Sequence, residues 1–150
     1  PQFVTVGPYT RLDNWVLDLR TPVNQAIFKV KSRICNLFRS YLDKQGFIEI
    51  YTPKIQGAAT ELGASVFKLQ YFDQTAFLAQ LPQLAKQMVI AAYFERVYEI
   101  RLVFRADNSN TYQHITKFIG LDLEMTIKEH YHEVIDLIDF MFIHFFKGIQ

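Results

Sequence analysis

Apolar residues recur at steps of three and four between Thr21 and Gly46, with basic residues in other positions. Thr21 is a good N-cap, Pro22 suits the first helical position, and Gly46 suits the position after the last turn. This spacing predicts an amphipathic helix of about six turns. Its apolar positions are Ile27, Val30, Ile34, Leu37, Phe38, Tyr41 and Leu42.

The pattern then changes to the alternation and short apolar runs expected of strands. Five segments are strand-like: 47–51, 66–72, 75–79, 96–104 and 118–127. The second and third predict a hairpin around Asp73-Gln74, and helices are predicted from Pro82 to about Tyr93 and from about His132 to Phe146. Strands joined by short turns, with helices in separate blocks, predict an α+β domain with an antiparallel β-sheet flanked by helices.

The first 20 residues follow neither the helical period nor the alternation of a strand, and Gly7-Pro8 indicates a turn. We therefore expect an irregular lead-in segment over 1–20 and one domain over 21–150, because no internal repeat or low-complexity linker divides the chain. A hydrophobic content of 50% suffices for a sizeable core, and 14 Phe residues predict an aromatic-rich one.

Charge and cysteine content narrow the functional classes. The 16 basic and 15 acidic residues give a net charge of +1, which excludes a protein that grips a nucleic-acid backbone over a large surface. Cys35 is the sole cysteine, which excludes an internal disulfide or a cysteine zinc cluster, and a small buried thiol is expected there. Apolar runs are short and broken by charges, so we expect no membrane span and a reducing, cytoplasmic setting.

The polar segment between the last two strand-like runs carries the candidate chemistry. Arg105 ends the first run, Phe118 opens the second, and His114 lies near the rim. A fixed guanidinium can bridge phosphate oxygens and a carboxylate, and a Phe ring can stack on a purine. This set suits a nucleotide site without a Gly-rich loop. On pattern alone, a surface Arg, a core Phe and a solvated loop is the stronger interpretation.

The pair His130 and His132 raises the question of a metal site, because a His-x-His pair can chelate. Residues two apart at a helix start point to different sides, however. A capped, solvated helix end is the stronger interpretation, and no metal site is predicted.

Residues 104–118 are similar to motif 2 of the class II aminoacyl-tRNA synthetases, in which a strand ends in Phe-Arg-x-Glu and a second strand opens with Phe after a loop. Pro53, after a long helix and a short strand, occupies the place of the motif 1 proline at the dimer interface. Ser-Asn-Thr at 109–111 and Gly-Leu-Asp-Leu-Glu-Met at 120–125 narrow the resemblance to the aspartate, asparagine and lysine subgroup.

Gln83, followed three residues later by Lys86, looks like the signature of the aspartyl branch of archaeal and eukaryotic type. The asparaginyl and lysyl branches usually have an uncharged residue at the second position. The resemblance extends from about Arg11 to Gln150 and implies the N-terminal part of a class II catalytic core. Motif 3 would lie beyond Gln150 and the anticodon-binding barrel before Pro1.

The resemblance implies an aspartate–tRNA ligase as the parent activity. Aspartate and ATP would form aspartyl-adenylate, and the aspartyl group would pass to tRNA(Asp). The reaction would need Mg²⁺, with ligands expected outside this chain, and the family implies a homodimer without a membrane partner.

Site residues follow by the same resemblance. Arg105 would be catalytic and would bridge the ATP α-phosphate and the substrate carboxylate, with Asp107, His114 and Phe118 also at ATP. The aspartate-binding residues would be Glu61 and Gln83 at the α-ammonium, and Lys86 with Asp122 at the side-chain carboxylate. Asparagine would leave Lys86 unpaired in a desolvated pocket, which favours the acid over the amide.

Several residues depart from the family pattern. Arg101-Leu102 replaces Gly-Pro before motif 2. Leu62 replaces a Gly in the segment 56–64, which is rich in small residues and is expected to be a mobile loop. The other departures are Trp15, Leu81, Ala85, Asp107, Gln113 and Lys117. We expect the 150-residue chain to be inactive by itself. Two alternatives stay open: a non-catalytic paralogue acting as a dimerisation or regulatory module, and an asparaginyl- or lysyl-specific relative.

Overall fold

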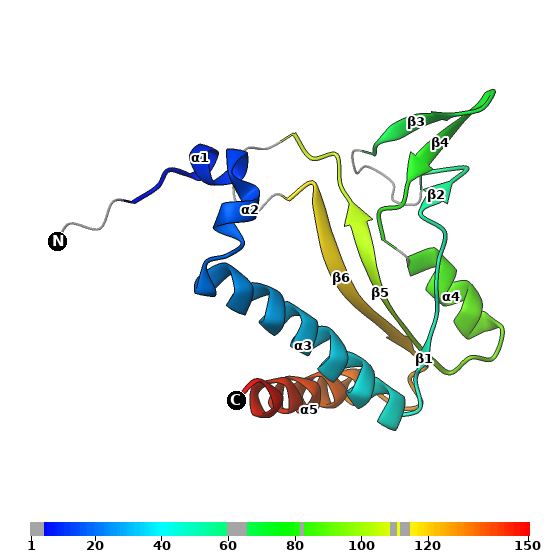
Figure 1. Ribbon diagram of the computed structural model, residues 1–150. Coiled ribbons are helices and arrows are strands. Elements are labelled where there is room, and N and C mark those ends of the chain that lie inside the picture. Colours follow the sequence, from blue (N-terminus) through cyan, green and yellow to red (C-terminus); the bar gives the residue numbers. More distant parts are fainter. Residues whose placement is uncertain (1–4, 60–65, 82, 109–110, 112–114) are drawn as a thin grey trace.

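The computed structural model of the chain describes residues 5–59, 66–81, 83–108, 111 and 115–150 (Figure 1). Helices and strands alternate in blocks along these residues. In chain order the elements are α1 (Pro8–Asp13), α2 (Trp15–Asp18), α3 (Pro22–Lys44), β1 (Ile48–Glu49), β2 (Ile55–Gln56), β3 (Lys68–Tyr71), β4 (Gln74–Leu78), α4 (Gln83–Ala91), β5 (Arg96–Phe104), β6 (Lys117–Met125) and α5 (His132–Ile149).

The lead-in segment is helical, and the expectation of an irregular segment over 1–20 is wrong on this point. Two short helices, α1 and α2, occupy it. The Arg11 Nε atom lies 2.7 Å from Asp18 Oδ1, and Asn24 Nδ2 donates to the Asp18 carbonyl at 2.8 Å. Helices this short have too few turns to show a helical period in the sequence. The contacts of Asp18 with Arg11 and Asn24 connect α1, α2 and α3.

The long helix α3 begins at Pro22 and ends at Lys44, as its sequence signals predict. Gly46 follows it with φ +79°, a left-handed conformation that glycine adopts without a steric penalty. Thr21 does not cap α3 through its side chain; its hydroxyl donates to the Asp18 carbonyl at 2.7 Å. The threonine therefore joins α2 to α3.

Two three-stranded sheets form, in the orders β1-β5-β6 and β2-β4-β3. The β5–β6 pair is antiparallel, from Arg96 opposite Met125 to Phe104 opposite Lys117. The predicted hairpin around Asp73 is β3–β4, and it is also antiparallel. The α+β class with antiparallel sheets is confirmed, with one exception: β1 pairs with β5 in parallel.

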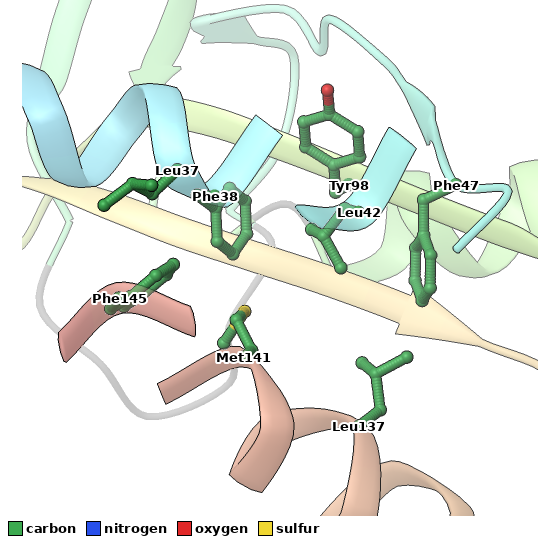
Figure 2. Packing of buried hydrophobic residues seen from close by; sticks show 8 residues of the cluster. All are labelled: Leu37, Phe38, Leu42, Phe47, Tyr98, Leu137, Met141 and Phe145. Carbon is green, nitrogen blue, oxygen red and sulfur yellow. The ribbon is translucent and has the colours of Figure 1, made fainter. Parts of the chain in front are cut away.

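One face of the β5–β6 pair packs against α3 and α5, which lie side by side (Figure 1). Because alternate residues of a strand point to opposite faces, Tyr98 and Ile100 face these helices, with Leu121 and Leu123 beside them. Figure 2 shows Tyr98 with its oxygen pointing away from the cluster, where its hydroxyl donates to Asp43 Oδ1 at 2.8 Å.

The core is aromatic-rich, as the Phe content predicts. The ring of Phe38 lies edge-on to that of Tyr98, with centroids 5.5 Å apart, and tilted against that of Phe145. The buried cluster consists of Leu37, Phe38, Leu42, Phe47, Tyr98, Leu137, Met141 and Phe145 (Figure 2).

Cys35 lies on α3 beside this core as a half-buried free thiol. It is more accessible than the buried position that its place in the helical pattern predicts. Among the helices of the described residues, none is both long enough and apolar enough to cross a membrane.

Candidate functional site

The second face of the β5–β6 pair carries ionisable side chains. Antiparallel register places Glu99 opposite Asp122, Arg101 opposite Gly120, and Val103 opposite Phe118. Directly paired residues share one face of a sheet, so these side chains lie on the face away from α3 and α5. Helix α4 packs against this part of β5 and β6 (Figure 1).

Lys86 is the buried residue of α4, with only 5% of its surface exposed. Its Nζ atom lies 3.3 Å from Glu124 Oε2 and 3.9 Å from Asp122 Oδ1. The same ammonium also donates to the Leu123 carbonyl at 3.4 Å. The structure thus holds one positive charge between two carboxylates. The nearer of them, Glu124, is not among the site residues that the sequence predicts.

Asp122 has an unused acceptor. Its Oδ2 atom is buried and has no hydrogen-bond partner among the described residues. A Cβ atom on Gly120 would lie 2.8 Å from this oxygen and 3.2 Å from Val103 Cγ2, so glycine leaves the space that the carboxylate occupies. Because an unsatisfied buried oxygen is costly, this position suits a donor that a ligand would bring.

Arg105 and Phe118 come together where β5 ends and β6 begins. The Arg105 amide donates to the Thr116 carbonyl at 2.9 Å, which extends the strand pairing. The guanidinium carbon lies 5.5 Å from the centroid of the Phe118 ring, within the range of a cation–π contact. The Arg105 Nε atom is buried without a hydrogen-bond partner among the described residues, which leaves a donor for an anionic ligand.

A second buried charge cluster surrounds Glu99. The carboxylate accepts hydrogen bonds from the Thr52 amide at 2.9 Å, the Thr52 hydroxyl at 2.8 Å and Lys54 Nζ at 2.9 Å. Arg101 Nη1 lies 3.5 Å from Glu99 Oε2. Burial alone would raise the pKa of Glu99, but the hydrogen bonds from Thr52 and Lys54 outweigh it and lower the pKa.

Sequence reasoning did not identify Glu99 as a site residue. The available signal was two charged residues, Glu99 and Arg101, at alternate positions within a strand-like run. A period of two places both on one face, but it does not tell whether that face is buried.

The structure places three other predicted residues on exposed segments. Gln83 begins α4, Asp107 follows β5, and Pro53 lies between β1 and β2, next to Thr52. The predicted site residues Glu61 and His114 lie outside the described residues.

The segment with His130 and His132 precedes and begins α5. Glu133 accepts hydrogen bonds from the amides of Glu129 at 2.8 Å and His130 at 3.1 Å, and these backbone donors lower its pKa. Within the described ranges, no group of three or more His, Cys, Asp or Glu side chains is placed to hold a metal ion. The side chain of Glu133 therefore binds the exposed backbone just before α5.

The α+β core carries buried charges on one face of a sheet and an Arg–Phe pair at a strand end. Sequence comparison identifies the class of protein with these features. Residues 7–150 match the model of the family described as tRNA synthetases class II (D, K and N). The chain belongs to this family.

Among its relatives, the cytoplasmic aspartate–tRNA ligase 1 of Dictyostelium discoideum is 56% identical over 149 residues, covering 99% of this chain and 26% of the relative. The chain therefore spans about a quarter of that protein's length.

Two solved structures are similar in fold. An aspartyl-tRNA synthetase from Entamoeba histolytica has a TM-score of 0.80 and 47% identity, over 99% of this chain and 26% of that one. An asparaginyl-tRNA synthetase from Pyrococcus horikoshii, complexed with asparaginyl-adenylate, has a TM-score of 0.85 and 34% identity, over 96% and 34% of the two chains. The higher identity is to the aspartyl protein.

Proposed function

We propose that the full-length protein carrying this chain is a cytoplasmic aspartate–tRNA ligase, and that this chain supplies its aspartate pocket and part of its ATP site. The similarity to aspartate–tRNA ligases supports the substrate. The observation that carries the proposal is the buried ammonium of Lys86 beside Asp122 and Glu124.

Lys86 selects a carboxylate over an amide in this proposal. The substrate's side-chain carboxylate binds the ammonium, whose other contacts to Glu124 and the Leu123 carbonyl hold it in place. Asparagine offers no charge, so it would leave the ammonium without its substrate partner in a site from which water is largely excluded.

Gln83 and Glu61 bind the α-ammonium of aspartate in the same proposal. Gln83 precedes Lys86 by three positions on α4, and residues at that spacing lie next to each other on a helix. One face of α4 therefore presents the amide oxygen of Gln83 to the α-ammonium of aspartate, and the ammonium of Lys86 to its side-chain carboxylate. Asp122 keeps a free acceptor beside them.

ATP binds at the end of β5, at Arg105, Asp107 and Phe118, and the family resemblance assigns His114 to the same ligand. The α-carboxylate of aspartate attacks the α-phosphorus, the bond to the pyrophosphate oxygen breaks, and aspartyl-adenylate forms. Arg105 bridges both reactants and stabilises the charge on the α-phosphate, while Phe118 stacks on adenine. The distance of 5.5 Å between the Arg105 guanidinium and the Phe118 ring supports assigning both residues to one nucleotide site. Mg²⁺ would bind the phosphates of ATP, with its protein ligands expected outside this chain.

The aspartyl group then passes from the adenylate to the terminal ribose of tRNA(Asp). We also propose that the protein is a homodimer in which Pro53 contributes to the interface. Pro53 is exposed between β1 and β2, where a second subunit can reach it.

Substituting Lys86 in the full-length protein tests the substrate assignment. Lys86→Met keeps the length of the stem and removes the charge, so we expect kcat/KM for aspartate in ATP–pyrophosphate exchange to fall by about 100-fold or more. KM for ATP should stay within about twofold. The matched control is Lys44→Met at the exposed end of α3, which should leave both unchanged. A Lys86→Met enzyme with the parent's preference for aspartate would overturn the assignment.

A further inference from the structure

The edge of β5 that faces away from β6 makes backbone hydrogen bonds near its two ends and side-chain contacts between them. Near the start, the Ile50 amide donates to the Tyr98 carbonyl at 2.8 Å, and at the end the Phe104 amide donates to the Ala79 carbonyl at 3.2 Å. Glu99 and Arg101 lie between these points and reach the segments that pass along this edge. Their side chains extend the contact where the backbone pairing of β1 has ended.

Arg101 joins three segments through one guanidinium. Its side chain has 0% exposure. Nη1 donates to the Thr52 hydroxyl and lies 3.5 Å from Glu99 Oε2, while Nη2 donates to the Gln80 carbonyl at 3.0 Å. The planar guanidinium of arginine donates toward Thr52 and Gln80 at the same time, whereas the single ammonium of lysine lacks this fixed fork of donors.

The Gln80 carbonyl lies close in sequence to two proposed site residues of α4. Gln80 is itself buried, and it precedes Gln83 by three residues and Lys86 by six. One residue earlier, Ala79 is bonded on both sides, because its amide donates to the Lys54 carbonyl at 2.9 Å and its carbonyl accepts from Phe104. The bond from Arg101 to the Gln80 carbonyl therefore lies three residues before the beginning of α4.

We propose that Arg101 is a positioning residue for the aspartate pocket, because its bond to the Gln80 carbonyl fixes the start of α4. Through α4 it sets Gln83 and Lys86 against Asp122 and Glu124 on the neighbouring strand. The link to aspartate rests on the proposed function, whereas the anchoring of α4 does not. The sequence singles out this residue, because arginine stands here where the family pattern has glycine.

The charges around Arg101 decide which substitution is informative. Without Arg101, Glu99 keeps Thr52 and the partly exposed Lys54 as partners. Without Glu99, the guanidinium would remain fully buried with only neutral oxygens as acceptors, and the fold would suffer. Arg101→Met is therefore the mild single variant, since it fills much of the same volume. The double variant Glu99→Gln/Arg101→Met leaves neither charge behind.

Amide hydrogen exchange on the full-length protein tests the anchor. In Arg101→Met and in the double variant, we expect the amides of α4 to exchange about tenfold faster, with those of α3 unchanged. The control is Leu102→Met, the next residue of β5, which is 41% exposed and points to the opposite face. Unchanged exchange in α4, or an equal acceleration in α3, would overturn the anchor.

Steady-state kinetics on the same variants test the positioning role. We expect KM for aspartate to rise about tenfold while KM for ATP stays within about twofold, because Arg105 is held at the end of β5 by its backbone hydrogen bond to Thr116 and not by α4. Equal increases in both, or no increase in either, would show that Arg101 has only a structural role. A wild-type protein without aspartate-dependent exchange would instead overturn the proposed function, and hydrogen exchange would still decide the anchor.

Discussion

At the scale of single residues, the site is a balance of charges on a buried sheet face. Lys86 supplies one positive charge against Asp122 and Glu124, and the second oxygen of Asp122 has no hydrogen-bond partner among the described residues. A ligand that brings both an ammonium and a carboxylate complements this set, since the first suits the free acceptor and the second suits Lys86. An α-amino acid with an acidic side chain meets both requirements.

Arg105 is the residue whose loss we expect to affect chemistry most. Arg105→Ala removes the donor that neutralises the α-phosphate as the carboxylate attacks, so adenylate formation in the full-length protein should be abolished. The measurement is ATP–pyrophosphate exchange at saturating aspartate. Activity within about threefold of the parent would contradict the role assigned to Arg105.

A matched control separates that effect from a change in fold. Arg33→Ala alters an exposed arginine on α3 whose Nε donates to the Gly148 carbonyl at 3.0 Å, far along the chain from β5. It should retain exchange activity. Thermal unfolding of both variants should show that each remains folded.

Sequence patterns located some residues of the site and not others. Arg105 and Phe118 were predicted to meet because each lies where a strand ends or begins, and two antiparallel strands bring such positions together. Glu99, Arg101 and Glu124 carry no such signal, because alternation places a charge on a face without telling what covers that face. Only the packing of α4 and of the segment around Thr52 shows that Glu99 and Arg101 are buried and that Glu124 is half-buried.

At the scale of elements, the fold depends on the contact between α3 and α5. Phe38, Leu42 and Phe145 belong to one buried cluster with Tyr98 of β5 (Figure 2). A Cβ atom on Gly148 would lie 2.5 Å from Leu37 Cδ2, so the last turn of α5 approaches α3 closely. These helices form the support on which β5 and β6 present the site.

Phe38→Ala tests this support. Phe38 is 1% exposed, so truncation should lower the free energy of unfolding by about 3–5 kcal/mol through lost burial and the cavity left behind. Chemical denaturation measures this loss. Phe28→Ala on the same helix, where the ring is 54% exposed, is the control and should cost less than about 1 kcal/mol. Equal losses in both variants would mean that α3 does not pack as described.

Elements were predicted best where local signals at their ends are strong. The bounds of α3 follow from Pro22 and Gly46, and the hairpin β3–β4 from the turn at Asp73. The helices α1 and α2 were missed because they are short and depend on contacts such as that of Arg11 with Asp18. The parallel pairing of β1 with β5 joins segments far apart in sequence, for which local periodicity gives no information.

At the scale of the whole molecule, the β5–β6 pair separates two kinds of packing. One face supports the apolar cluster of α3 and α5, and the other holds the ion pairs of Lys86 and of Glu99. A net charge of +1 over the chain therefore conceals a local concentration of charge around the site. Such concentrations are typical of functional sites, because burying charges costs free energy that stability alone does not require.

The acid sensitivity of the fold should reflect this concentration. The folded-state pKa of Glu99 is lowered, so its contribution to stability is fully present above the unfolded pKa of about 4.3 and is lost as the pH falls through the folded value. We expect the free energy of unfolding to fall as the pH drops below about 5.

Glu99→Gln should make the free energy of unfolding depend less on pH below about 5. At neutral pH the variant should be less stable than the parent, because Arg101 loses its anionic partner. Denaturation curves at several pH values measure both effects. Glu95→Gln, at an exposed position just before β5, is the control. Identical slopes for Glu99→Gln and the parent would contradict the stabilising role of the Glu99 carboxylate.

The most direct test of the account is ATP–pyrophosphate exchange by the full-length protein with aspartate, asparagine and lysine in parallel. We expect exchange with aspartate, with kcat/KM about 100-fold or more above that of the other two, because among the three only aspartate brings a side-chain carboxylate to the ammonium of Lys86. A comparable value for asparagine or lysine, or no exchange with any of the three, would contradict it.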